Sequence, residues 1–154
     1  MTPRIANPFA LAPAAIKALF ALEGTFKDSG LEFELQELVK LRASQINGCA
    51  FCLHMHATDA RARGMDEYRI HLLAGWRESS LYSRRERAAL AWTEALTLIA
   101  QTGAPDADYA LIEQEFTEAE RVQLTIAIGA INLWNRLQVG VRGAHPEGAS
   151  HVAA

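Results

Sequence analysis

Residues 37–56, ELVKLRASQINGCAFCLHMH, contain both cysteines of the chain, Cys49 and Cys52. Apolar residues recur at helical spacing before the pair and are interrupted by an Asn-Gly dipeptide, which predicts a helix that ends at a left-handed glycine cap. After Gly48 the chain contains neither Pro nor Gly until Gly64, so a second helix is expected to begin at Cys49. The sequence therefore predicts two consecutive helices with the cysteine pair at their junction.

A pair of thiols separated by two residues is typical either of half a metal site or of a dithiol that closes reversibly to a disulfide. The first turn of a helix favours an anion, and a CxxC pair there commonly has a lowered thiol pKa. The alternatives are inert buried cysteines and a zinc site formed by Cys49, Cys52 and His56 or His54. Structural zinc usually has four protein ligands, and no second CxxC or paired histidine is evident. We therefore favour the redox dithiol and expect no bound metal or cofactor.

The expected second helix places Cys49, Cys52 and His56 on one face, with His54 on the opposite side. In the preceding helix, Glu37 begins a stripe of residues (i, i+4, i+7) that leads toward the junction. If the two helices fold back on each other, this stripe can bring the Glu37 carboxylate near His56. The predicted site therefore combines a carboxylate, two thiols and an imidazole.

The order Glu37, eleven residues, Cys49-x-x-Cys52, three residues, His56 resembles the active-site pattern of the AhpD-like alkylhydroperoxidases. These proteins belong to the carboxymuconolactone decarboxylase superfamily. The resemblance continues through WRE at 76–78, SRRERAAL at 83–90 and INLWNR at 131–136, and it covers roughly residues 9–139. CxxC alone is a weak signal, but with the acid and the histidine at these offsets in a helical chain it becomes specific.

The resemblance implies a peroxidase cycle and a role for each site residue. Cys52 would attack a hydroperoxide and become a sulfenic acid, Cys49 would close the disulfide, and His56 and Glu37 would relay protons. An external dithiol would reopen the disulfide, and in the family this can be a lipoyl group carried on a partner protein. The family also commonly forms homo-oligomers such as trimers or hexamers, so a homo-oligomer is expected here.

Phe51 departs from the family pattern, because well-studied peroxidase members have a histidine directly before the second cysteine. Phenylalanine can neither relay a proton nor hydrogen-bond to a peroxide. A thiol–disulfide oxidoreductase or a redox sensor with little peroxidase activity is therefore the alternative function. The decarboxylase branch ranks lower because its members generally lack a CxxC pair, and a non-enzymatic helical scaffold is the remaining alternative.

The rest of the chain predicts an all-α fold of about six to seven helices with no strand signal. The first three expected helices are Pro8 to about Leu22, ended by Gly24, then 32–45, then 49–63. A short helix follows Asp66, and another runs from the capping box at Ser83 to a break at Gly103. The last two helices are 106–116 and a helix from the capping box at Thr117 to about Val139. The last helix is apolar nearly all round, which predicts burial on several sides, within the protomer or in an oligomer. Residues 143–154 are expected to be a loose tail.

The length and composition suit a single globular domain over 1–154, since half of the 154 residues are hydrophobic, and the resemblance implies that this domain is AhpD-like. The net charge is −3. No basic stripe indicates nucleic acid and no polybasic run indicates a membrane surface. Pro8, Pro13 and Lys17 interrupt the apolar N-terminus, so a signal peptide is not expected and a reducing cytoplasm is favoured. Structural roles are expected for the remaining residues. Trp76, Trp92 and Trp134 are expected in the core, and Asn135-Arg136 in structural contacts or an interface. Residues 84–87 are expected to form a solvated helix start, and His54, His71, His145 and His151 to lie on the surface or in the tail.

Overall fold

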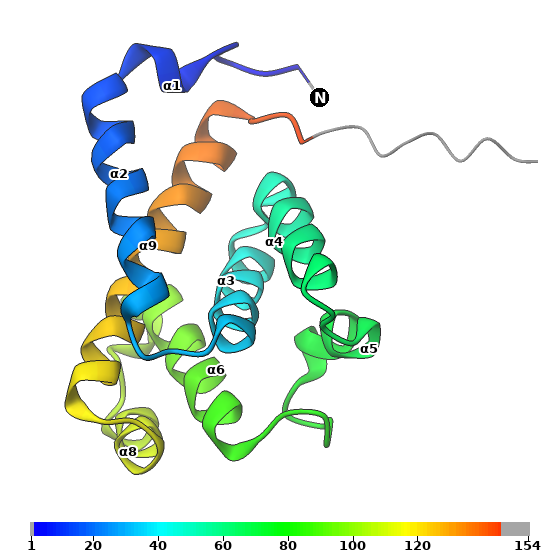
Figure 1. The fold of residues 1–154 in the computed structure, drawn as a ribbon, viewed down its shortest axis with the longest axis vertical. Coiled ribbons are helices and arrows are strands. Elements are labelled where there is room, and N and C mark those ends of the chain that lie inside the picture. Colours follow the sequence, from blue (N-terminus) through cyan, green and yellow to red (C-terminus); the bar gives the residue numbers. More distant parts are fainter. Residues whose placement is uncertain (1, 146–154) are drawn as a thin grey trace, which may run out of the picture.

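The computed structural model describes residues 2–145, and these residues form helices joined by short turns (Figure 1). The helices are α1 (Pro8–Leu11), α2 (Pro13–Thr25), α3 (Phe33–Asn47), α4 (Ala50–Ala62), α5 (Glu67–His71), α6 (Arg84–Thr97), α7 (Ile99–Thr102), α8 (Asp106–Glu115) and α9 (Glu118–Val141), with 3-10 turns η1 (Phe26–Asp28) and η2 (Leu72–Gly75). No strand occurs within this described part, so the predicted all-α class is confirmed.

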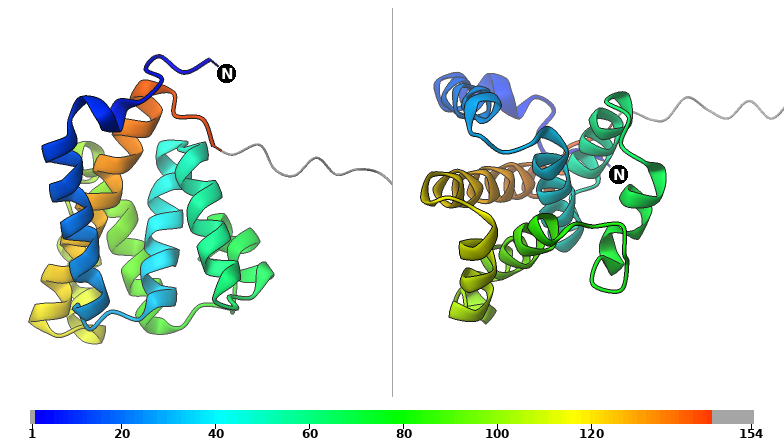
Figure 2. Two further views of the ribbon diagram at one scale, coloured as in Figure 1. Left: turned by 45° about the horizontal axis from the view of Figure 1, so that its top comes forward. Right: turned by 60° about the horizontal axis from the view of Figure 1, so that its bottom comes forward.

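The central helix is α3, which packs against α4, α6 and α9 (Figures 1 and 2). Every residue from Leu35 to Ser44 except Arg42 is buried, and these residues include the charged side chains of Glu37 and Lys40. Buried charges are costly unless they are paired. Both have a partner in another helix, and these partners lie at the candidate site.

The caps expected from the sequence set the ends of the main helices. Gly48 ends α3 in the left-handed conformation with φ +66°, which costs glycine little because it has no Cβ. Both predicted capping boxes are present: Ser83 caps α6 and Thr117 caps α9 through reciprocal hydrogen bonds with Glu86 and Glu120.

Two predicted helices are each divided in the structure. The N-terminal segment breaks at Ala12 because Pro13 has no N–H to continue the helical hydrogen bonding, and it restarts as α2. Gly24 does not end this helix, which continues to Thr25. The segment expected to run from Ser83 to Gly103 is also divided, by a non-helical backbone at Leu98 with φ −103° and ψ 29°.

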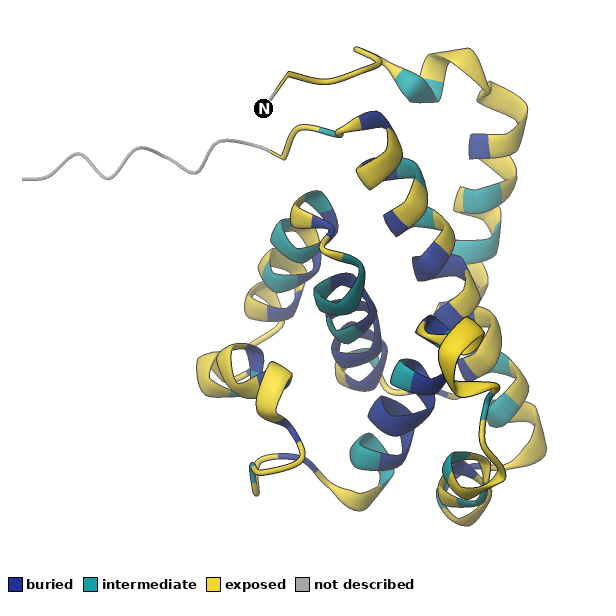
Figure 3. Cartoon of the chain, turned by 180° about the vertical axis from the view of Figure 1, so that it is seen from behind, coloured by how far each residue is buried: buried dark blue, intermediate teal, exposed yellow. Residues whose placement is uncertain are grey.

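The prediction that α9 is buried on several sides is confirmed within the protomer, because α9 packs against α2, α3, α4, α6 and α8. Exposed residues also occur on this helix (Figure 3): Val122, Ile126 and Leu133 share one exposed side, and Val139 is exposed near the C-terminal end. None of the helices in residues 2–145 combines the length and the apolar character that a bilayer crossing requires.

The prediction of a solvated start for 84–87 is wrong, except at Arg84. The Arg85 guanidinium lies on the Phe116 ring and pairs with Glu120 at 2.6 Å. The Arg87 guanidinium donates to the carbonyls of Trp76, Arg77 and Ser79. These two arginines therefore connect α6 to neighbouring segments. The predicted loose tail covers residues 143–154, of which 146–154 lie outside the described residues.

Candidate active site

The cysteine pair lies at the start of α4, as the sequence predicts. Cys49 is the N-cap residue, its Sγ accepts a hydrogen bond from the Cys52 backbone N–H at 3.3 Å, and the two residues are joined as a disulfide with Cα atoms 5.4 Å apart. Both side chains are buried. The unpaired N–H groups of a first helical turn favour a thiolate at this position once the disulfide is reduced.

Glu37 and His56 are brought together across the α3–α4 hairpin. The Glu37 Oε2 atom lies 2.9 Å from His56 Nδ1, and both side chains are buried. This hydrogen bond fixes the orientation of the imidazole ring. The expected approach of Glu37 to His56 is therefore present, although their catalytic roles remain predictions. His54 lies elsewhere and stacks on His145 with ring centroids 5.6 Å apart.

A network of buried amides holds the helix junction. The Asn47 side-chain amide donates to Oδ1 of both Asn132 and Asn135 at 2.9 Å each. Asn135 in turn donates to Ser44 Oγ at 3.0 Å, and the Cys49 N–H donates to the Ser44 carbonyl at 3.0 Å. Asn135 therefore has the structural role that was predicted, and it connects α9 to the turn that carries the cysteines.

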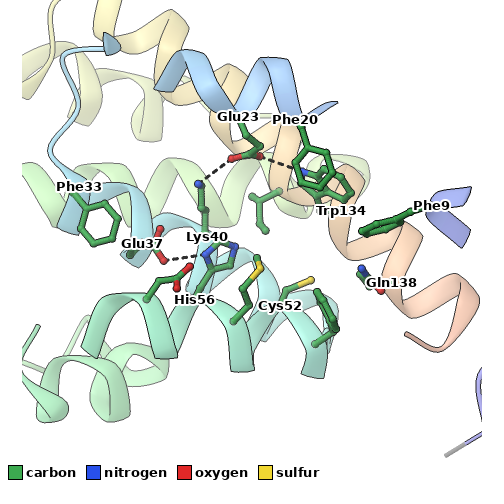
Figure 4. Close-up of a pocket in the computed structure, with 14 residues that line it drawn as sticks. Phe9, Phe20, Glu23, Phe33, Glu37, Lys40, Cys52, His56, Trp134 and Gln138 are labelled. Carbon is green, nitrogen blue, oxygen red and sulfur yellow. Dashed lines mark hydrogen bonds and ion pairs between the residues drawn. The ribbon is translucent and has the colours of Figure 1, made fainter. Parts of the chain in front are cut away.

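A cavity of about 370 Å³, here called the substrate cavity, lies between the α3–α4 hairpin, α9 and the N-terminal helices (Figure 4). Cys52, Glu37 and His56 all line it, whereas Cys49 does not. The remaining lining residues are mainly aromatic or apolar: Phe9, Phe20, Phe33, Phe51, Met55, Ile131 and Trp134, together with Glu23, Lys40, Asp59 and Gln138. One of the two cysteines therefore shares an apolar chamber with the buried acid–imidazole pair.

Glu23 of α2 holds one side of this cavity in place. Its carboxylate accepts from Lys40 Nζ at 3.0 Å and from Trp134 Nε1 at 3.1 Å (Figure 4). Trp134 also packs against the rings of Phe9 and Phe20, with centroids 5.9 and 5.5 Å away. Trp134 is thus half-buried: it packs against the core residues around Ile131, as predicted, but it also forms part of the cavity wall, which the prediction did not include. Trp76 and Trp92 are buried as expected.

Sequence reasoning missed the N-terminal contribution to the site. Phe9, Phe20 and Glu23 come from short helices whose positions relative to α9 depend on long-range contacts that periodicity does not encode. Asp59 was also missed, although a signal exists: it follows His56 by three residues and so lies on the same face of α4.

Three potential ligand atoms of Glu37, His56 and Asp59 lie within 4.8 Å of one another. An imidazole and two carboxylates can bind a divalent cation, but the Nδ1 atom of His56 and a Glu37 oxygen already contact each other. The zinc site considered from the sequence would need the cysteine sulfurs, which are joined to each other in this state. Among the described residues, Glu37, His56 and Asp59 form the group whose geometry is most similar to that of a metal site.

The hairpin is further fixed to α6 by a part-buried ion pair. Glu94 accepts from Arg42 at 2.7 Å, from Trp76 at 2.8 Å and from Arg77 at 2.5 Å. Burial by itself would raise the pKa of Glu94, but the hydrogen bonds from Trp76, Arg77 and Arg42 outweigh it and the pKa is lowered. Glu94 therefore stays ionised and paired at neutral pH.

The all-helical fold and the CxxC pair beside a buried Glu–His pair define an AhpD-like protein. A model of the carboxymuconolactone decarboxylase family matches residues 12–95, and the chain belongs to this family. An uncharacterised relative, YdfG of Bacillus subtilis, is 39% identical over 133 residues, which cover 86% of this chain and 90% of YdfG.

Solved structures agree with this assignment. A protein of unknown function from Agrobacterium tumefaciens, suggested to be an antioxidant defence protein AhpD, has a TM-score of 0.90 and 48% identity, covering 95% of this chain and 99% of that one. An alkylhydroperoxidase AhpD core from Ralstonia eutropha, an uncharacterised peroxidase-related protein, has a TM-score of 0.79 and 20% identity over 96% of this chain and 78% of that one. The second likeness concerns the fold alone.

Proposed function

We propose that the protein is a thiol-dependent peroxidase that reduces apolar organic hydroperoxides through Cys49 and Cys52. One observation carries the proposal: Cys52 lines the same aromatic cavity as the buried Glu37–His56 pair. A nucleophilic thiol needs a base within reach, and a proton must be supplied to the leaving oxygen. The apolar lining favours an alkyl or aryl hydroperoxide, whose organic part can be buried there.

The proposed cycle begins with reduced cysteines. His56, oriented by Glu37, accepts the Cys52 thiol proton, and the thiolate attacks the terminal peroxide oxygen. The O–O bond breaks, Cys52 becomes a sulfenic acid, and the alkoxide takes the proton from His56 and leaves as an alcohol. Cys49 then attacks the Cys52 sulfur, which releases water and forms the disulfide.

An external dithiol would complete the cycle by reducing the disulfide. Relatives in the family can use a lipoyl group on a partner protein, and we extend this class of electron donor to the present chain. We also propose a cytoplasmic location, where such donors are kept reduced, and a homo-oligomer, to which the exposed apolar residues of α9 are suited.

The alternative function is thiol–disulfide exchange or redox sensing without efficient peroxide turnover, and Phe51 favours it. Phe51 lines the substrate cavity beside Cys52, where its ring offers no hydrogen bond to a peroxide. The peroxidase proposal therefore places the whole proton relay on His56 and Glu37.

The deciding experiment measures intact mass and free thiols of metal-free, reduced protein before and after one equivalent of cumene hydroperoxide. The proposal expects loss of both thiols and of two hydrogens, much faster than oxidation of free cysteine. Cys52→Ser should not react, whereas Cys49→Ser should react once and retain a sulfenic acid. The reverse pattern would exchange the two roles. If both thiols remain unoxidised, the peroxidase proposal fails and the thiol–disulfide exchange function remains. If they remain unoxidised and the protein as isolated contains zinc, a metal site is indicated.

A further inference from the structure

A second cavity, of about 430 Å³, lies beside the cysteine pair and is lined by residues at the start of α4 and around the end of α9. Here it is called the thiol cavity. Cys49 lines it and Cys52 does not, which is the reverse of the substrate cavity. Phe51 and Gln138 line both cavities and so form the partition between them. The two sulfur atoms of one disulfide therefore belong to different chambers.

The two chambers also differ in charge. The substrate cavity contains three carboxylates, those of Glu23, Glu37 and Asp59, against one lysine and one histidine. Among the described residues that line the thiol cavity there is no carboxylate, and Arg142 and His145 are present. An anion is therefore disfavoured in the first chamber and favoured in the second.

Arg142 is the residue best placed to select a ligand. It ends α9 in a left-handed conformation with φ +56°, is exposed, and has no ion-pair partner within residues 2–145. Its backbone N–H is used by the helix end, bonding to the carbonyls of Gln138 and Val139. The guanidinium is thus available to a ligand that enters the thiol cavity.

We propose that the thiol cavity is the binding site of the reductant, and that it selects a thiol carrying an anionic group, which attacks Cys49. This inference rests on the proposed function, since it assigns the electron donor of the same disulfide. A lipoyl group linked to its carrier by an amide is itself neutral, so for that donor the anionic group is an acidic side chain of the carrier beside the dithiol. It places the oxidising and reducing steps on opposite sides of the partition formed by Phe51 and Gln138.

A reductant thiolate attacks Cys49 Sγ, the Cys49–Cys52 bond breaks, and Cys52 leaves as a thiolate beside His56 in the substrate cavity. A second thiolate, from the same dithiol or from another molecule, attacks the reductant sulfur of the mixed disulfide and releases Cys49. Two reductant thiols become one disulfide, and the two protons they lose are taken up by the cysteines. The geometry therefore returns Cys52 to the state that reacts with peroxide.

Three small monothiols of similar size test the charge preference: 2-mercaptoethanesulfonate is anionic, 2-mercaptoethanol is neutral and cysteamine is cationic. Protein whose disulfide has been formed with diamide is mixed with each thiol, and opening is followed by rapid quenching with maleimide and mass spectrometry. Rate constants are expressed per thiolate. We expect the sulfonate to be fastest and cysteamine slowest, with the mixed disulfide on Cys49 and maleimide on Cys52.

Charge variants test whether the preference for an anionic thiol arises at the thiol cavity. Arg142→Glu should reverse the order of the three thiols and lower the sulfonate rate about tenfold, because it replaces attraction with repulsion. Arg142→Lys should keep the order. Arg84→Glu is the matched control: it changes the net charge equally, Arg84 is exposed and lines neither cavity, and the order should be unaffected.

Two bulky substitutions at exposed helix positions separate the chambers. Val139→Trp narrows the thiol cavity and should lower the ratio of thiol opening to peroxide oxidation, whereas Met55→Trp narrows the substrate cavity and should raise it. A mixed disulfide on Cys52 would overturn the inference. So would an order of the three thiol rates that stays the same when the charge at position 142 is reversed. Absence of peroxide oxidation together with the expected thiol order would instead reject the peroxidase and retain this reductant site.

Discussion

The α3–α4 hairpin and the N-terminal arm, residues 2–25, both line the substrate cavity, but they are held in very different ways. The hairpin is buried along most of α3 and is connected to α6 and α9 by the Glu94 ion pair and by the amide network of Asn135. In α2 of the arm, only Ile16 is buried. The arm is attached through Glu23, through aromatic contacts with Trp134, and through Arg4, which donates to the carbonyls of Gly140 and Val141.

This difference suggests a division of roles, in which the hairpin carries out the reaction and the arm determines which substrate is preferred. The hairpin supplies the two cysteines, Glu37 and His56, which must hold precise geometry. The arm supplies Phe9, Phe20 and Glu23, which shape the space that an organic group would occupy. Substitutions in the hairpin should therefore change the reaction itself, while those in the arm should change which peroxide reacts best.

The largest effect is expected at the acid–imidazole pair. His56→Gln removes the base that accepts the Cys52 proton, so both iodoacetamide alkylation and cumene hydroperoxide reaction at neutral pH should slow about 100-fold. His54→Gln is a matched control on the same helix but outside the substrate cavity. An unchanged rate of both reactions in His56→Gln would remove this residue from the mechanism.

The amide network gives the second effect, on stability. Asn135→Ala leaves Asn47 and Ser44 without their buried partner, which should lower the free energy of unfolding by about 1–3 kcal/mol. Urea denaturation of the reduced protein measures this. Leu133→Ala, two residues away and exposed, should shift the midpoint by much less. Equal shifts would mean that the network contributes nothing specific to the hairpin.

The contrast between hairpin and arm also explains what the sequence could predict. Glu37, Cys49, Cys52 and His56 lie within 20 residues, so helical periodicity and one glycine cap suffice to bring them together. The caps of α6 and α9 were likewise predicted because their signals are local. The division at Pro13 was missed although its signal was present.

The arm could not be placed in this way. Glu23 meets Trp134 across 111 positions of sequence, and no local pattern specifies that pairing. The same limit applies to the thiol cavity, which joins the start of α4 to the end of α9. The cavity-wall position of Trp134 and the pairing of Arg85 were missed for the same reason, because their surroundings come from distant segments.

A third effect concerns acid stability of the hairpin. The pKa of Glu94 is lowered in the folded protein, so its contribution to stability is present above its unfolded pKa, about 4.3, and is lost as the pH falls through the folded value. Glu94→Gln should cost about 1 kcal/mol at pH 7. Below about pH 5, the free energy of unfolding of this variant should also decrease less steeply with falling pH than that of the wild type. Urea midpoints measured between neutral and acid pH would test both effects, and Glu113→Gln is the control, because the Glu113 side chain is exposed on α8. Parallel pH curves for wild type and Glu94→Gln would contradict the prediction.

The smallest effect is expected in the arm. Glu23→Gln keeps an acceptor for Trp134 but removes the charge that pairs with Lys40, so the arm should be held less firmly over the cavity. Because a rim contact of this kind is worth about 1 kcal/mol, kcat/KM for cumene hydroperoxide should fall only about fivefold. Hydrogen peroxide has no organic group to bury, so its kcat/KM should change much less, and the ratio of the two is the quantity to measure. Lys17→Gln, which alters an exposed charge on the same helix outside the cavity, should leave that ratio unchanged. If Glu23→Gln slowed both peroxides equally, the arm would have to act on the hairpin chemistry, and the separation between the two regions would fail.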